Sequence, residues 1–126
     1  MAQRVLVGDD NEQMRHLLVE LLQAEGYEVS QAGDTGQVLE QLAHSRADLL
    51  ILDVQMPGGG GVEALRAIQA DPACQSLPVL LLSGSVDLEV DWASRVGADA
   101  QLTKPFRIDE LRDTVGSLLS RQKLSH

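Results

Sequence analysis

The chain has few aromatic residues and a single cysteine, and both shortages narrow the range of proteins it can be. Its 126 residues include one Trp, one Tyr and one Phe, so the core must be built from Val, Leu, Ile and Ala. Such a composition is typical of buried strands covered by helices. Cys74 alone cannot form an intramolecular disulfide, which favours a reducing compartment. No histidine stands beside Cys74, so a catalytic thiol is not expected.

Positive charge and long apolar runs are also scarce. The sequence carries 19 acidic and 10 basic side chains, a net charge of -9. Nucleic acids and anionic membranes are bound by clusters of Lys and Arg, so neither is expected as a direct partner. No apolar run approaches the length of a membrane span, and residues 1–4 lead into a short strand without a signal-peptide pattern. These features predict a soluble cytoplasmic protein, whose acidic surface serves mainly its solubility.

Short apolar runs alternate with stretches of helical period along the chain. Strands are predicted at 4–8, 27–30, 49–52, 78–82 and 100–103. Helices are predicted at about 12–25, after a cap at Asp34 or Thr35, after the glycine-rich loop 57–61, at about 88–96 and at 108–119. The run 49–52 is the most hydrophobic and is expected at the centre of a sheet. Ile108, Leu111 and Val115 are expected on the buried face of the last helix.

Five β-α units with short connections predict one α/β domain over residues 1–120, followed by a short polar tail at 121–126 that is expected to fray. The expected architecture is a doubly wound, flavodoxin-like fold, with a five-stranded parallel sheet and helices on both faces. The common strand order for such folds is 2-1-3-4-5. Ligands then bind outside the carboxyl ends of the strands, near the switch point between strands 1 and 3.

Polar residues stand at the carboxyl ends of four predicted strands. Asp9 and Asp10 follow the first strand, Asp53 the third, Ser83 the fourth and Lys104 the fifth. Each has an ordinary explanation when taken singly, as a helix cap, a turn residue or a surface lysine. Their joint occurrence at four strand ends instead favours convergence in one crevice.

The residue types at these strand ends indicate a particular chemistry. Three carboxylates packed together repel one another, so the site needs a cation, and oxygen ligands favour Mg²⁺. A carboxylate can also be the nucleophile that accepts a phosphoryl group. Phosphoryl transfer depends mostly on positioning and charge compensation, which Mg²⁺, the Lys104 ammonium and the Ser83 hydroxyl would each supply at one phosphoryl oxygen.

In this order and spacing, the motifs resemble the receiver domain of response regulators in two-component signalling. The resemblance covers Val5 to about Leu119, and the motifs that carry it are Asp9-Asp10, Leu50–Pro57, Ser83-Gly84 and Lys104–Phe106. It implies that Asp53 is the phosphoacceptor and that Asp9 and Asp10 serve Mg²⁺, with Asp10 as the direct ligand.

The resemblance also assigns roles to the remaining strand-end residues. The backbone carbonyl of Gln55 would complete the metal shell, and Ser83 and Lys104 would follow the phosphoryl group. The Lys104–Pro105 peptide bond is often cis in such domains, which physical chemistry permits for a bond to proline.

The family's receivers are signalling domains that catalyse their own phosphorylation from phosphohistidine or a small phosphodonor, and lose the phosphoryl group slowly. The switch changes the face formed by the fourth helix, fifth strand and fifth helix. The implied partners are a sensor histidine kinase or phosphotransfer protein, and a downstream protein or linked output domain outside this chain. The implied assembly is a monomer or a phosphorylation-dependent dimer.

Several positions depart from the family pattern or carry its variation. Gln101 stands three residues before Lys104, where the family usually has an aromatic switch residue. The aromatic side chain of the family's switch is therefore not expected at this position. The run Gly58–Gly61 replaces a loop that usually has more side chains. Gln55 and Ser85 stand where the family tunes the rate of dephosphorylation.

Three other functions compete with the receiver. A haloacid-dehalogenase-type phosphatase needs Asp-x-Asp at the first strand, whereas this chain has adjacent Asp9 and Asp10 there. A flavin-binding domain needs a Ser/Thr/Gly-rich loop after the first strand, and two aspartates would repel its phosphate. A phosphorylation-independent interaction module on the same fold is the principal alternative, and phosphorylation assays separate it from a working receiver.

Overall fold

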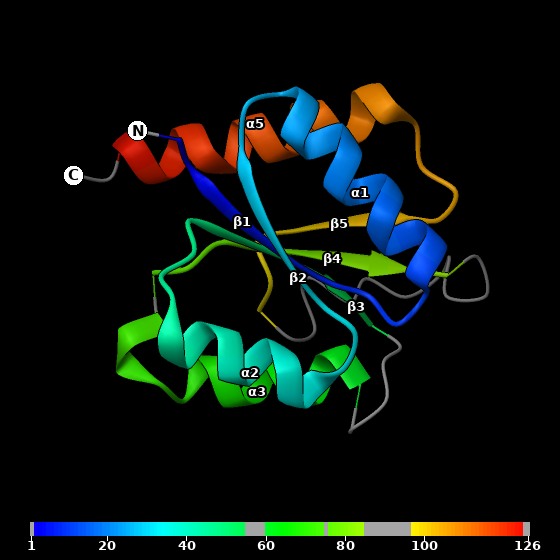
Figure 1. Cartoon of the computed structure of the whole chain (residues 1–126). Coiled ribbons are helices and arrows are strands. Elements are labelled where there is room, and N and C mark those ends of the chain that lie inside the picture. The colour runs from blue at the N-terminus through cyan, green and yellow to red at the C-terminus, as the bar shows by residue number, and fades with distance from the viewer. Residues whose placement is uncertain (1, 55–59, 75, 85–96, 125–126) are drawn as a thin grey trace.

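The strands form one parallel sheet in the order β2-β1-β3-β4-β5, as predicted (Figure 1). The computed structural model describes residues 2–54, 60–74, 76–84 and 97–124. The strands are β1 (Arg4–Gly8), β2 (Glu28–Ala32), β3 (Leu49–Asp53), β4 (Val79–Ser83) and β5 (Ala100–Thr103). The helices are α1 (Glu12–Ala24), α2 (Thr35–His44), α3 (Gly60–Gln69), the short 3₁₀ helix η1 (Pro72–Cys74) and α5 (Ile108–Leu124). The helix predicted at 88–96, which includes Trp92, lies outside the described residues.

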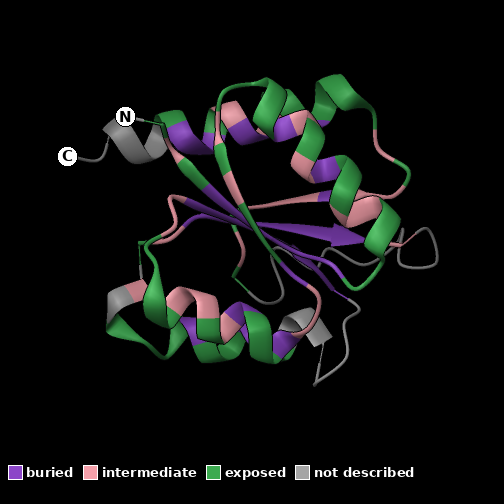
Figure 2. Ribbon diagram, in the orientation of Figure 1, coloured by how far each residue is buried: buried purple, intermediate pink, exposed green. Residues whose placement is uncertain are grey.

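Two apolar clusters attach the helices to the two faces of the sheet (Figure 2). β3 and β4 are buried at every position, which confirms the central place predicted for the run 49–52. On one face the cluster joins the strands to buried side chains of α1 and α5, namely Leu18, Leu22, Leu111, Val115, Leu118 and Leu119. On the other face it joins them to buried side chains of α2 and α3, namely Val38, Ala64, Leu65 and Ile68.

Side-chain caps start the first two helices at defined residues. The Asn11 side chain accepts a hydrogen bond of 2.9 Å from the Met14 N–H, and this satisfies a donor that has no partner within α1. Asp34 does the same for the Gln37 N–H at 2.8 Å, which decides between the two predicted caps of α2. Gly26, at φ 95°, allows the chain to turn after α1.

Several element boundaries differ from the predictions. β2 starts at Glu28 and continues to Ala32, because its register with β1 pairs Ala32 with Gly8. β4 starts at Val79, after Pro78, which has no N–H to donate. α3 already begins at Gly60, inside the run predicted as a loop, and residues 57–59 lie outside the described part.

The last helix also differs from its prediction in two ways. α5 continues past Leu119 to Leu124, so the segment expected to fray is helical as far as that residue. Ile108, predicted on the buried face, is 57 % exposed. It is the first residue of α5 and lines a mainly apolar pocket together with Leu21 and Tyr27. The apolar spacing of α5 therefore includes one residue, Ile108, that the core does not bury.

Candidate functional site

The register of the sheet brings the predicted site residues to one edge. Gly8 pairs with Leu52, and Asp53 pairs with Leu82, so Asp9, Asp53 and Ser83 leave neighbouring strands at the same end. Parallel strands present their carboxyl ends together, and the helices that follow β1 and β3 pack on opposite faces of the sheet, so the crevice lies between these two strands. This is the placement that the strand-end argument predicted.

Asp9, Asp10 and Asp53 each offer a carboxylate oxygen within 4.8 Å of the others. Asp9 is fully buried and Asp53 is 5 % exposed, whereas Asp10 faces solvent. A set of hard oxygen donors of which two are buried and one faces solvent suits Mg²⁺, which keeps several of its waters. The residues present therefore fit a magnesium ion.

Lys104 lies between two of these carboxylates. Its Nζ donates to Asp53 Oδ2 at 2.8 Å and to Asp9 Oδ2 at 3.0 Å. With the three carboxylates, this one ammonium leaves a formal local charge of -2, which a divalent cation balances. The Lys104 N–H also donates to the Ser83 carbonyl at 2.7 Å, and the Lys104–Pro105 peptide bond is cis.

Burial and the two carboxylates act on the lysine in opposite directions. Burial alone would lower the pKa of Lys104, but hydrogen bonds to Asp53 and Asp9, together with their charges, outweigh it and raise that pKa above its ordinary value. Lys104 is therefore a permanent cation of the site at neutral pH.

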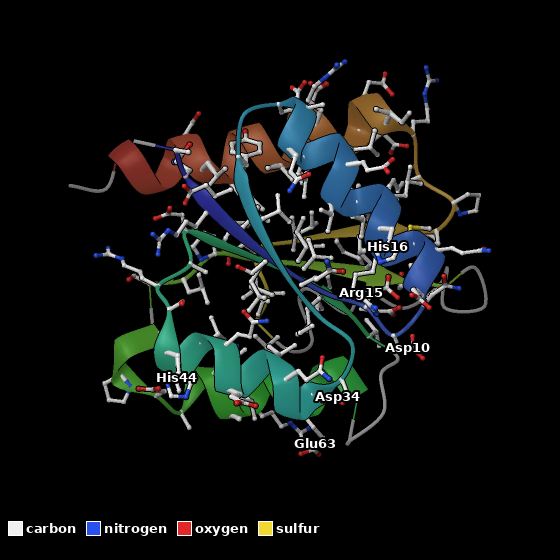
Figure 3. All side chains as sticks on the ribbon, in the orientation of Figure 1. Asp10, Arg15, His16, Asp34, His44 and Glu63 are labelled. Atoms are coloured by element: carbon white, nitrogen blue, oxygen red, sulfur yellow. The ribbon has the colours of Figure 1, made fainter. Side chains whose placement is uncertain are left out.

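The backbone around Asp9 is fixed by two further contacts. The Asn11 N–H donates to Asp9 Oδ1 at 2.9 Å, so one carboxylate oxygen is bonded to the start of α1 while the other contacts Lys104. Arg15 Nη1 donates to the Asp9 carbonyl at 2.8 Å, and its Nε donates to Gln31 Oε1 at 3.0 Å. Figure 3 shows Asp10 and Arg15 at this end of α1. Sequence reasoning missed Arg15, because nothing in the helical pattern distinguishes it from a surface arginine.

The carboxyl end of β4 carries a buried hydroxyl. Ser83 is fully buried, and Gln101 Nε2 on β5 donates to its Oγ at 3.3 Å. The sequence singled out Gln101 only as a departure from an aromatic position, and its contact with Ser83 was not expected. Gln55 and Ser85, predicted for the metal shell and for tuning, lie outside the described residues.

Known proteins resemble the chain over almost its whole length. The family described as "Response regulator receiver domain" matches residues 5–116. The chain is 33% identical over 119 residues to sporulation initiation phosphotransferase F of Bacillus subtilis, covering 94% of this chain and 95% of that protein. It is 34% identical over 122 residues to the DNA-binding response regulator MtrA of Mycobacterium tuberculosis, covering 96% of this chain and 52% of that protein.

Solved structures show the same likeness. Chemotaxis response regulator CheY4 of Vibrio cholerae superimposes with a TM-score of 0.85 at 30% identity, covering 94% of this chain and 99% of that one. NtrX of Brucella abortus, solved in complex with ADP, has a TM-score of 0.90 at 31% identity, covering 99% of this chain and 29% of that one. The chain spans about half the length of the DNA-binding regulators it matches, as the 52% coverage of MtrA illustrates.

Proposed function

Because the chain belongs to the response-regulator receiver family of two-component signal transduction, we propose that it is a phosphoacceptor switch that takes a phosphoryl group onto Asp53. The donor would be a sensor histidine kinase or a phosphotransfer protein. The observation that carries this proposal is the position of the Asp53 carboxylate. It is almost buried, it contacts Lys104, and it lies within 4.8 Å of two further carboxylates.

The step is a displacement at phosphorus. A carboxylate oxygen of Asp53 donates a lone pair to phosphorus, and the phosphorus–nitrogen bond of a phosphohistidine breaks. The imidazole nitrogen keeps that electron pair and takes a proton from water, and Asp53 becomes an acyl phosphate. With acetyl phosphate as donor, the bond that breaks is phosphorus–oxygen and acetate leaves.

The surrounding groups compensate the charge of the phosphoryl oxygens. The Lys104 ammonium, already 2.8 Å from Asp53 Oδ2, would contact one oxygen, and the Ser83 hydroxyl would donate to another. Asp9, Asp10 and Asp53 would hold Mg²⁺, with the Gln55 carbonyl implied by the family resemblance. When bound, the ion supplies positive charge to the transferring group.

Phosphorylation would act on a partner through the face that includes β5 and α5. The phosphoryl group would draw the Ser83 hydroxyl toward Asp53, which Lys104 already contacts. The Lys104 N–H is bonded to the Ser83 carbonyl, so the ends of β4 and β5 would respond together. A downstream protein or a linked output domain would respond to this change.

We place the switch in the cytoplasm, where its one cysteine stays reduced. Separately, no helix among residues 2–54, 60–74, 76–84 and 97–124 is long and apolar enough to cross a membrane.

The test is intact mass spectrometry after incubation with acetyl phosphate, in Mg²⁺ and in EDTA, for the wild type and Asp53→Asn. The expected result is one phosphoryl adduct in wild type with Mg²⁺, and none in EDTA or in the variant. A wild type that stays unmodified by both acetyl phosphate and a phosphorylated histidine kinase would support the phosphorylation-independent interaction module instead.

A further inference from the structure

The Ser83 hydroxyl has a polar neighbour that the proposed phosphoryl transfer does not use. Gln101 Nε2 donates to Ser83 Oγ at 3.3 Å. Leu81 is the register partner of Gln101 in the β4–β5 pair, and Ser83 follows Leu81 by two residues. Side chains two residues apart on a strand leave the same face, so Ser83 and Gln101 are diagonal neighbours on one side of the sheet.

The direction of this hydrogen bond decides what the hydroxyl can do next. A serine hydroxyl has one hydrogen to donate and lone pairs that accept. Because Gln101 donates to the oxygen, it occupies a lone pair and leaves the hydroxyl hydrogen for a different acceptor. Ser83 is fully buried, so a missing or misdirected partner at this oxygen is costly.

The proposed phosphoryl transfer would supply such an acceptor at the end of β3. Ser83 follows Leu82, which is the register partner of Asp53, so the hydroxyl and the carboxylate stand at the same end of adjacent strands. A phosphoryl group on Asp53 offers anionic oxygens, and these are strong acceptors. A hydroxyl that already accepts a hydrogen bond is also more polarised and donates more strongly.

We propose that Gln101 is a positioning residue that directs the Ser83 hydroxyl toward a phosphoryl group on Asp53. The proposal rests on the phosphoacceptor function above and adds a residue to it. Gln101 stands where the family resemblance implies an aromatic residue. At this position of β5, a hydrogen bond to Ser83 therefore takes the place of an aromatic ring. The relay runs from the Gln101 amide through Ser83 Oγ to the phosphoryl oxygen.

The test compares phosphorylation rates with acetyl phosphate in saturating Mg²⁺. Gln101→Leu keeps a similar volume but has no donor, so the maximal rate should fall about threefold while the half-saturating acetyl phosphate concentration stays unchanged. Gln101→Glu offers only acceptors at neutral pH and should draw the Ser83 hydroxyl hydrogen to itself. We expect a larger loss of about tenfold, similar to that of Ser83→Ala.

Two readouts separate positioning from general damage. In the Ser83→Ala background, Gln101→Leu should cause no further loss of rate, because Gln101 acts through the missing hydroxyl. In ¹⁵N-labelled protein, the Gln101 side-chain amide signal should shift on phosphorylation in wild type and stay in place in Ser83→Ala. Gln23→Leu, an exposed position near the end of α1, is the matched control and should leave the rate unchanged.

Each outcome bears on a specific part of the proposal. A phosphorylated wild type with a Gln101→Leu variant of equal rate would overturn the relay alone. Equal losses from Gln101→Leu in the presence and absence of Ser83 would also overturn it. A wild type that accepts no phosphoryl group would overturn both the relay and the phosphoacceptor function. If Gln101→Leu fails to fold, the near-isosteric Gln101→Glu decides the question, with melting temperature as the check on its folding.

Discussion

The Lys104 ammonium donates to the Asp53 carboxylate at 2.8 Å, across a sequence separation of 51 residues. Lys104 follows β5 and Asp53 is the last residue of β3, and β4 lies between these strands in the sheet. The contact therefore spans the width of a strand at the edge where the site is formed. Together with the contact to Asp9, it makes one lysine the counter-charge of two carboxylates that water scarcely reaches.

Removing this cation should destabilise the metal-free protein. Lys104→Met keeps most of the side-chain volume but leaves the carboxylates of Asp9 and Asp53 without a positive partner. We expect a loss of about 2–4 kcal/mol in the free energy of unfolding in EDTA, because an uncompensated buried charge is costly. Urea unfolding in EDTA and in Mg²⁺ measures it, and Mg²⁺ should recover part of the loss. An equal and small loss in both buffers would contradict this role for Lys104.

The same contact predicts a pH dependence with a definite sign. Because the folded-state pKa of Lys104 is raised, its contribution to stability is fully present below the unfolded pKa of about 10.4 and is lost as pH rises through the folded pKa. The difference in unfolding free energy between wild type and Lys104→Met should be constant up to about pH 9.5 and shrink above that. Tyr27, whose pKa burial also raises, is common to both proteins and cancels. A difference that grows with pH would show that the assigned cation is wrong.

Much of the fold follows from local patterns that burial reinforces. The runs that became β3 and β4 are apolar throughout, and only the centre of a parallel sheet buries a strand on both faces. The strand order was predicted as the one that is common for five β-α units, and right-handed connections reduce the number of alternatives. Asp9, Asp53 and Lys104 could be placed together because each stands at the carboxyl end of a strand, where position depends on the backbone and not on the reach of a side chain.

The predictions that were wrong or missing concern residues whose position depends on the reach of a long side chain or on competition between local structures. Ile108 fits the apolar period of its helix, but its side chain is 57 % exposed, whereas Leu111 one turn later is buried. Gly60 was predicted to be part of a loop, yet it starts α3. The contacts of Arg15 with Asp9 and of Gln101 with Ser83 depend on the rotamers of long side chains, which no periodicity encodes.

Arg15 should contribute more to the free energy of unfolding than a surface arginine does. Its Nη1 donates to the Asp9 carbonyl and its Nε to Gln31, and a lysine, whose donors all lie on one nitrogen, does not reproduce these two donor positions. Arg15→Lys should therefore lower the free energy of unfolding by about 1–2 kcal/mol. Arg66→Lys is the matched control, because its ion pair with Glu63 is 3.9 Å long and well exposed, and it should cost under about 0.5 kcal/mol. Equal effects of the two substitutions in urea unfolding would refute the special role of Arg15.

The single thiol should react slowly. Burial, the negative charge of Asp71 and a hydrogen bond of 3.9 Å from Cys74 Sγ to Asp71 Oδ2 all raise the pKa of Cys74. Asp71→Asn removes the charge and weakens that hydrogen bond, so the midpoint of the pH–rate profile for alkylation by iodoacetamide should move to lower pH. Asp113→Asn, an exposed position on α5, changes the net charge equally and should leave the midpoint in place. An unmoved midpoint in Asp71→Asn would contradict the assigned cause.

The central claim is that Asp53 itself carries the phosphoryl group, and chemical trapping tests it most directly. Borohydride reduces an acyl phosphate at its carbonyl carbon and releases phosphate, so a phosphorylated aspartate becomes homoserine, which tandem mass spectrometry locates in a peptide digest. After incubation with acetyl phosphate and Mg²⁺, homoserine should appear at position 53 and nowhere else. Homoserine at position 9 or 10, or none in a protein that has gained a phosphoryl group, would show that the acceptor lies elsewhere.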